Sequence, residues 1–246
     1  MPSAPPFSKT LAALMFAVLT QAACTDTETQ EKLDGLVTQE AQQAEQNRDY
    51  EAASRHYATL YQHKPDDPGV IQGLARALRN VGRFEEARTL LDDAVARLGP
   101  QPRLLLERGK DEISLGHADL AVQTLTAAIK ATPADWEAPA TLAIAYDRLG
   151  RTDEAEAQYR VATSLNPDNA DILNNYALSR ALAGHLDEAL SLLRRAVTLP
   201  SAGPQVRENL ALLEGLAPQH ATVSRGPRPL VDPGQGPGGG AGASPP

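Results

Sequence analysis

The chain has 246 residues, of which 42% are hydrophobic, 4% aromatic and 22% charged, and its formal net charge is −8. A single cysteine excludes a disulfide scaffold and a zinc site built from cysteines. The acidic balance disfavours a broad basic surface, so we expect no nucleic-acid partner. Few aromatic residues beside abundant alanine and leucine disfavour a β-sandwich and predict an all-α protein.

Residues 1–23 have the layout of a secretory signal. They contain no acidic residue, carry one lysine, Lys9, and include an apolar run over residues 11–19 that is followed by small residues. A weakly positive start, a short apolar core and small residues at the cleavage site are typical of such signals. Because the apolar run is about half as long as a membrane span, we do not expect a simple transmembrane helix.

Cys24, the only cysteine, directly follows Ala22 and Ala23. This arrangement resembles a bacterial lipobox, in which the thiol is diacylated and the cysteine becomes the mature N-terminus, although Gln21 stands where such boxes usually carry an aliphatic residue. Several acyl chains would hold the protein durably at a membrane, since each buried CH₂ contributes about 0.8 kcal/mol. The alternative is an ordinary signal peptide that is cut near Ala23. Residues 24–33 are predicted to be a tether.

The middle of the chain repeats itself every 34 residues. The period is carried by four glycines, Gly82, Gly116, Gly150 and Gly184. An alanine lies five residues after each of them, and one period earlier Ala53 has Arg48 in the place of the glycine. Prolines recur near the unit ends, at Pro65, Pro133 and Pro167 in register and at Pro100 and Pro200 one residue away. A fixed period of this length is the signature of a solenoid.

Each unit is predicted to form two antiparallel helices. Glycine fits the turn between them, apolar and small residues follow one helical stripe, and proline ends the second helix. The pattern resembles the tetratricopeptide repeat, with second helices that begin in RDYEAA, GRFEEA, GRTDEA and GHLDEA. The resemblance implies a superhelical solenoid of about five helix-turn-helix repeats, at residues 34–67, 68–101, 102–135, 136–169 and 170–203.

Two further segments follow the repeats. Residues 204–216 carry apolar side chains at helical spacing and are predicted to form a capping helix over the exposed edge of the last repeat. Residues 217–246 are dominated by proline, glycine, serine and alanine. Because such a segment cannot bury enough apolar surface to offset its ordering entropy, we predict a disordered tail.

The tetratricopeptide resemblance implies a concave groove that is lined by the first helices and binds peptides or helices of other proteins. We take the second, fifth, ninth and twelfth positions of each first helix as facing this groove. In the second and third repeats these positions hold Gln72, Arg76, Arg79, Arg103, Leu106, Lys110 and Ile113. In the fourth and fifth they hold Glu137, Ala140, Ile144, Asp147, Asp171, Asn174, Leu178 and Ala181. The prediction is a basic portion beside a more apolar, mildly acidic portion; the alternative is that these side chains are only solvated.

No catalytic motif occurs in the sequence. The five histidines form no HExxH motif, no GxSxG follows a strand-like run, and no Walker glycine loop ends in GK[ST]. Carboxylate pairs such as Asp92 and Asp93 fall on predicted helices with no sign of a pocket. We therefore predict a protein that is not an enzyme and has no cofactor, metal or small-molecule substrate.

Residues 172–217 resemble a narrower family. They contain an LNN opening from residue 173, an LLRRA helix at 192–196, an LP-x-A-x-P connection at 199–204 and a V-R-x-NLAL cap at 206–212. These elements resemble the C-terminal repeats of the TadD family, the tetratricopeptide lipoproteins of tight-adherence (Flp-type) pilus assembly. The connection and the cap, together with the cysteine anchor, lie outside what the repeat pattern alone would produce.

The TadD resemblance implies an adaptor at the periplasmic face of the outer membrane that supports assembly or localisation of the pilus secretion machine. Its partners would be the secretin or associated subunits, and Thr25 after Cys24 is compatible with delivery to the outer membrane. One alternative is another envelope scaffold of the same fold, such as a type IV pilus pilotin or a subunit for outer-membrane-protein assembly. A second alternative is a soluble periplasmic regulator of cell-wall hydrolases.

Overall fold

The computed structural model describes residues 29–224, and the side chains of residues 29–216. The predicted signal peptide, the proposed anchor Cys24 and the part of the predicted tail from residue 225 onward lie outside the described residues. Within residues 29–224, the ordered elements are all helical.

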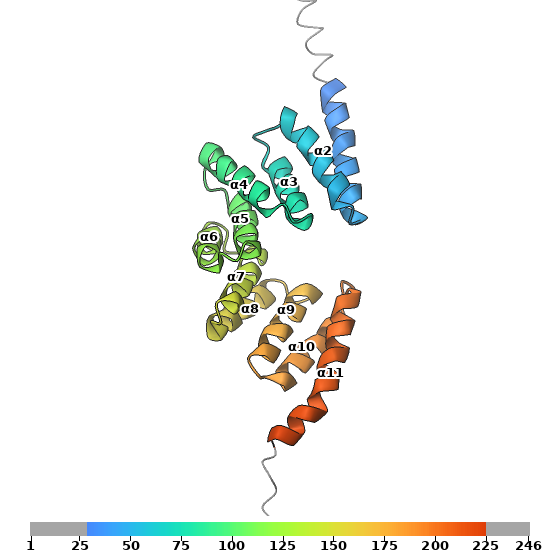
Figure 1. Ribbon diagram of the computed structural model, residues 1–246, viewed down its shortest axis with the longest axis vertical. Helices are drawn as coiled ribbons and strands as arrows, with labels where there is room; N and C mark the ends of the chain where they lie inside the picture. The colour runs from blue at the N-terminus through green and yellow to red at the C-terminus, as the bar shows by residue number, and fades with distance from the viewer. Residues whose placement is uncertain (1–28, 225–246) are drawn as a thin grey trace, which may run out of the picture.

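Five helix pairs follow one another and a last helix ends the array (Figure 1). The first pair consists of a helix over residues 29–46 and α2 (Tyr50–His63). The next pairs are α3 (Pro68–Asn80) with α4 (Phe84–Leu98), α5 (Pro102–Ser114) with α6 (Ala118–Ala131), α7 (Glu137–Arg148) with α8 (Thr152–Leu165), and α9 (Ala170–Leu182) with α10 (Leu186–Ala196). The array ends with α11 (Pro204–Ser224). The predicted all-α solenoid is confirmed.

Two helices extend beyond the predicted segment boundaries. The first already includes residues 29–33, which fall within the predicted tether. These residues contain no glycine or proline, and the Gln30 amide donates to Asp34 Oδ1 over 2.9 Å. At the other end, α11 continues past Leu216 to Ser224. Pro218 removes one helical hydrogen bond there without ending the helix. The glycine-rich part of the tail starts only after this helix.

The turns within the pairs explain the periodic glycines. Gly82, Gly116, Gly150 and Gly184 all have φ between 70° and 86°, in the left-handed region that favours glycine. In the first pair Arg48 takes this place with φ of 59°. Arg48 therefore occupies the turn position that the 34-residue period assigns to it, with the strain that a side chain brings to this conformation.

The core is built from the same period. The alanines that follow the turns, from Ala53 to Ala189, are fully buried, and so are the larger residues four positions further on, such as Leu91 and Tyr159. Small residues let the two helices of a pair approach closely, while the larger residues fill the space between successive pairs. Since each pair buries its apolar face only against its neighbours, the array gains stability by stacking.

The first helices lie side by side along one wall of the array, with α3 against α5, α5 against α7 and α7 against α9 (Figure 1). At the C-terminal end α11 packs on both α9 and α10. Its residues Val206 and Leu213 are buried there, and the Asn209 amide donates to Asn174 Oδ1 over 2.8 Å. Across residues 29–224, no helix combines the length and the hydrophobicity needed to cross a bilayer.

Candidate partner-binding wall

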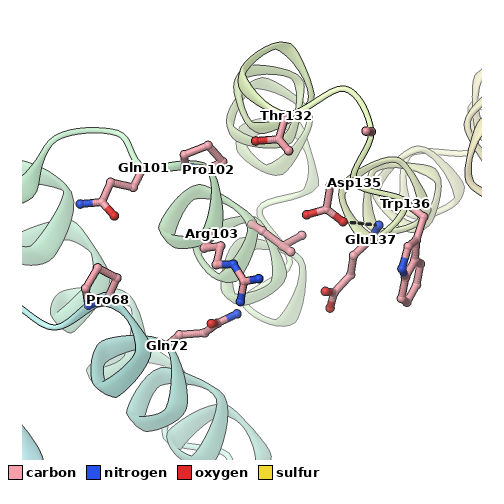
Figure 2. A pocket seen from close by; sticks show the side chains of 11 residues that line it. Pro68, Gln72, Gln101, Pro102, Arg103, Thr132, Asp135, Trp136 and Glu137 are labelled. Carbon is pink, nitrogen blue, oxygen red and sulfur yellow. Dashed lines mark hydrogen bonds between the residues drawn. The ribbon is translucent and has the colours of Figure 1, made fainter. Parts of the chain in front are cut away.

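A pocket of about 620 Å³ opens where the N-terminal ends of α3, α5 and α7 meet (Figure 2). Three of its lining residues, Pro68, Pro102 and Trp136, are the first residues of three successive repeats and are 34 positions apart in the sequence. The complete lining consists of Pro68, Gln72, Gln101, Pro102, Arg103, Leu106, Thr132, Ala134, Asp135, Trp136 and Glu137. A hollow of this size is in the range of ligand pockets.

Local chain geometry places these residues. Pro68 and Pro102 begin α3 and α5, where the missing N–H costs nothing and the fixed φ suits a helix. The Asp135 carboxylate accepts a hydrogen bond from the backbone N–H of Glu137 over 2.9 Å, which fixes the entry to α7 and with it Trp136. The pocket is thus formed by helix starts whose directions are set by proline and by capping.

Four of the predicted groove residues meet in this pocket, Glu137 among them. Leu106 is 2% exposed and forms part of its lining. Gln72 comes from α3, and Arg103 projects from α5 between Gln72 and Glu137 in Figure 2. Trp136 was not among the predicted groove residues. The same 34-residue period could have found it, because it aligns Trp136 with Pro68 and Pro102.

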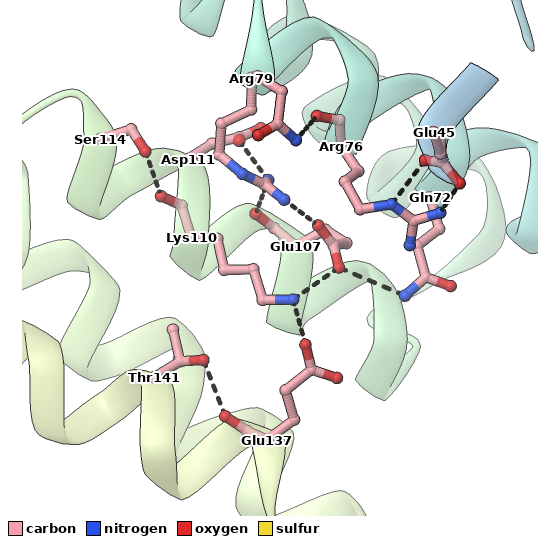
Figure 3. A network of polar contacts seen from close by, with 11 residues as sticks. Glu45, Gln72, Arg76, Arg79, Glu107, Lys110, Asp111, Ser114, Glu137 and Thr141 are labelled. Atoms are coloured by element: carbon pink, nitrogen blue, oxygen red, sulfur yellow. Dashed lines mark hydrogen bonds and ion pairs between the residues drawn. The ribbon is translucent and has the colours of Figure 1, made fainter. Parts of the chain in front are cut away.

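Behind the pocket lies a buried network of charges centred on Glu107 (Figure 3). The Glu107 carboxylate, which is fully buried, accepts hydrogen bonds from Arg79 Nη2 over 2.6 Å and from Lys110 Nζ over 2.9 Å. Arg79 Nη1 also donates to Asp111 Oδ1 over 2.7 Å, and Lys110 Nζ donates to Glu137 Oε1 over 2.5 Å. The network therefore ties α3, α5 and α7 together.

The two buried acids of this network have opposite pKa shifts. Burial alone would raise the pKa of Glu107, but Lys110 and Arg79 together hold it below its ordinary value. Burial raises the pKa of Asp111 to about 6, against the opposing effect of Arg79. Asp111 Oδ2 is buried and finds no hydrogen-bond partner among the described residues, which agrees with a carboxylate that is costly to ionise.

Arg76 belongs to a second cluster. Its Nε and Nη2 atoms donate to the two carboxylate oxygens of Glu45, each over 2.8 Å, and the Tyr57 hydroxyl donates to Glu45 Oε2 over 3.2 Å. This planar, two-point pairing is a strong arrangement for arginine and a carboxylate. It joins the helix of residues 29–46 to α3.

The predicted basic portion of the groove is therefore electrically balanced. Arg76, Arg79 and Lys110 are all paired, and their partners are Glu45, Glu107, Asp111 and Glu137. Counting only the second, fifth, ninth and twelfth positions left out Glu107 and Asp111, which occupy the sixth and tenth positions of their helix. The sequence does contain a signal for this pairing: Glu107 and Asp111 lie one helical turn apart on the helix that also carries Lys110.

Four other predicted groove residues lie elsewhere. Ile113 lines a separate hollow of about 350 Å³, and Ile144 is half-buried against a cluster that includes Tyr159. Asn174 is buried and accepts the hydrogen bond from α11 described above, while Leu178 is half-buried. The structure thus brings Gln72, Arg103, Leu106 and Glu137 together in one pocket, and Gln72 and Glu137 also contact the network of Glu107 and Lys110.

The stacked helix pairs and their continuous wall define a helical-repeat solenoid, a class of protein-interaction scaffold. Family profiles described as tetratricopeptide repeat match residues 44–106 and 140–205. A profile described as bacterial transcriptional activator domain matches residues 101–171. The chain therefore carries tetratricopeptide repeats.

Solved structures show the same fold. TTC0263, a thermophilic tetratricopeptide-repeat protein of Thermus thermophilus, is 22% identical with a TM-score of 0.70, over 74% of this chain and 100% of that chain. MamA from Desulfovibrio magneticus RS-1 is 20% identical with a TM-score of 0.53, over 68% and 94%. YrrB, described as a tetratricopeptide-repeat protein with an unusual peptide-binding site, is 19% identical with a TM-score of 0.50, over 72% and 88%. A search of curated proteins found no match.

Proposed function

We propose that this protein is a non-enzymatic adaptor that binds a segment of a partner protein on the wall formed by its first helices. The observation that carries the proposal is the pocket between α3, α5 and α7, where side chains from three successive repeats converge. Clefts of this kind on helical-repeat scaffolds suit extended peptides or single helices. YrrB, another protein of this fold, is described as having an unusual peptide-binding site.

The proposal includes a membrane anchor at Cys24. Its support is the position of the only cysteine directly after an apolar run and two alanines. Four residues, 25–28, lie between Cys24 and residue 29, where the described part of the first helix starts. A lipid-anchored chain would therefore hold its first repeat close to the membrane surface, on the periplasmic face of the outer membrane.

The proposal also places the protein in the assembly or localisation of a Flp/Tad-type pilus secretion machine, with the secretin or its associated subunits as partners. Its support is the resemblance of residues 172–217 to TadD. In the fold, the cap packs on the last repeat through the buried Val206, and the connection contacts the start of α9, where the Ser201 hydroxyl accepts a hydrogen bond from the Ala170 N–H over 3.3 Å.

Fractionation of cells that carry Cys24→Ala tests the anchor. We expect the wild-type protein in the membrane pellet and the variant in the soluble periplasmic fraction. Cys24→Ser serves as a second variant, because it keeps the size of the side chain while removing the thiol that is acylated. Persistence of both variants in the membrane pellet would remove the anchor from the proposal.

Deletion of the gene tests the pilus role. We expect surface pili and assembled secretin to be lost, and both to return with the wild-type chain. The double variant Arg103→Glu and Trp136→Ala should fail to restore them, whereas Arg55→Glu, a change at an exposed arginine of α2 outside the pocket, should restore them. Normal pili and secretin in the deletion strain would contradict the pilus assignment.

A further inference from the structure

The cations on the wall of first helices differ in whether they are paired with a carboxylate of the same chain. Arg76, Arg79 and Lys110 each bind carboxylates of the same chain. Arg103 is exposed and makes no hydrogen bond or ion pair with another residue of the described part of the chain. It lines the pocket between α3, α5 and α7, so its guanidinium group is available there to a ligand.

The carboxylates around the same pocket already have partners. Asp135 accepts the hydrogen bond from the Glu137 backbone, and the Glu137 side chain accepts the one from Lys110. Neither acid is paired with Arg103. Among the described residues, Arg103 is therefore the one cation of the pocket lining, and its guanidinium has no carboxylate partner there, although Asp135 keeps its own negative charge at the same pocket.

Apolar surface adjoins this charge. Trp136 is half-buried, Leu106 lies in the lining, and the rings of Pro68 and Pro102 complete a rigid apolar rim. Tryptophan and arginine are enriched among the residues that dominate binding energies, since both offer a large contact area together with hydrogen-bond donors. The combination favours a ligand that has one apolar group and one anionic group close together.

We propose that this pocket binds an extended segment of a partner protein in which a carboxylate side chain stands next to an apolar or proline residue. The carboxylate pairs with Arg103, and the neighbouring residue packs on Trp136 and Leu106. This inference rests on the proposed function and specifies the chemistry of its partner. It also moves the expected acidic contact from Arg76, Arg79 and Lys110 to Arg103.

The charges of the chain favour a partner over its own C-terminal segment. Residues 225–246 carry two arginines, Arg225 and Arg228, against one acid, Asp232. Such a segment repels Arg103 more than it attracts it, whereas an acidic partner segment complements the charge of Arg103. The occupant we propose is therefore a segment of another protein.

The single tryptophan of the chain makes the test direct, because the fluorescence of Trp136 reports on this pocket alone. The mature chain, residues 24–246, is titrated with an acetylated and amidated peptide that contains one aspartate between leucine and proline and no tryptophan. A second peptide has asparagine in place of the aspartate. We expect a saturable fluorescence change, with the aspartate peptide binding about five- to tenfold more tightly.

Two arginine variants assign the contact. Arg103→Gln should lower the affinity for the aspartate peptide to that of the asparagine peptide and leave the latter unchanged. Arg55→Gln, at an exposed arginine outside the pocket, should keep the full difference. Equal affinity of the two peptides for the wild-type chain, unchanged discrimination in Arg103→Gln, or no binding of either peptide would each overturn the proposal.

A chain that ends at Ser224 completes the experiment. Binding by this chain and by the full mature chain with the same affinity agrees with a partner segment as the occupant. Binding by the shortened chain only would assign the pocket to the chain's own C-terminal segment and overturn the proposal. Loss of pili in the deletion strain together with failed peptide discrimination would leave the adaptor role intact and remove only this pocket.

Discussion

The Tyr159 hydroxyl donates a hydrogen bond to Asp147 Oδ2 over 3.1 Å, and the two residues are 12 positions apart in the fourth repeat. The same contact at the same spacing joins Tyr57 to Glu45 in the first repeat. Asp147 also accepts a hydrogen bond from Ser179 of the next repeat over 2.7 Å. A carboxylate near the end of a first helix thus ties that helix to its own partner helix and to the following repeat.

Tyr159→Phe should lower the free energy of unfolding by about 1–2 kcal/mol, because Asp147 loses one of two donors in a half-buried site. The ring remains, so its stacking on Tyr176, with centroids 5.3 Å apart, is preserved. Burial raises the pKa of Asp147 and the hydrogen bonds from Ser179 and Tyr159 oppose this rise, so the variant should raise that pKa further. Urea unfolding measures the stability.

Tyr50→Phe is the matched control, since the Tyr50 hydroxyl makes no hydrogen bond with the described part of the chain. We expect its free energy of unfolding to stay within about 0.5 kcal/mol of the wild type. Equal losses in both variants would show that the Tyr159 hydroxyl contributes nothing specific to the fourth repeat.

Gly109→Ala should destabilise the third repeat, although alanine is the better helix former. A Cβ atom at this position would lie 2.5 Å from Leu125 Cγ, which α6 holds in the core. We expect a loss of about 1–3 kcal/mol, and a smaller combined loss than the sum of the single changes when Leu125→Ala is added. Thermal and urea unfolding measure both.

Gly215→Ala provides the contrast, because no atom of the described side chains and backbone lies within 4 Å of a Cβ atom at this position of α11. It should be neutral or stabilise by up to about 1 kcal/mol. A loss in Gly215→Ala as large as that in Gly109→Ala would mean that the close approach to Leu125 is not the cause.

The fold was predictable from the 34-residue period because the same interval governs three physical requirements at once. It sets the left-handed turn, the close crossing at the alanines and the end of the second helix. Even Arg48 takes the turn conformation that its register requires. Periodic packing leaves a periodic trace in the sequence, and that trace can be read without coordinates.

The site was less predictable because its charges pair between repeats. Arg79 reaches Glu107 and Asp111, which are 28 and 32 positions away, and neither interval equals the period. The sequence shows which charges exist but not which side chains meet across two packed helices. Arg103 can be recognised as available to a ligand only after the other cations of the wall have been assigned to their partners.

Leu213→Ala should destabilise the C-terminal end, whereas Leu212→Ala should not. Leu213 is 5% exposed and packs with Val206 in the last core cluster, while Leu212 is 60% exposed on the same helix. Removing the buried side chain should cost about 2–4 kcal/mol, and removing the exposed one should change stability by less than about 0.5 kcal/mol. Hydrogen exchange in α9 and α10 would show the loss locally. Equal exchange rates in both variants would contradict the role of α11 as a cap.

The buried pair Asp111 and Glu107 should give opposite pH dependences. Since the pKa of Asp111 rises from its ordinary value of 3.8 to about 6, the folded protein holds this proton more tightly than the unfolded chain does. The contribution of Asp111 to the free energy of unfolding therefore falls as the pH rises from about 4 to about 6. The pKa of Glu107 is lowered, so its contribution is present above its ordinary pKa and is lost in acid.

Asp111→Asn mimics the protonated acid and should gain about 2–3 kcal/mol relative to the wild type between pH 4 and pH 7.5, since each pKa unit corresponds to about 1.4 kcal/mol. For Glu107→Gln we expect the opposite trend: its free energy of unfolding should fall relative to the wild type over the same interval, by about 2–4 kcal/mol at pH 7.5. The reason is that Arg79 and Lys110 keep their charges beside a neutral amide. Urea unfolding of the three proteins at pH 4, 5, 6 and 7.5 measures both trends, and the effects of titrating groups that do not interact with Asp111 or Glu107 cancel in the differences. Parallel curves for Asp111→Asn and the wild type would show that Asp111 titrates in the folded protein as it does in the unfolded chain.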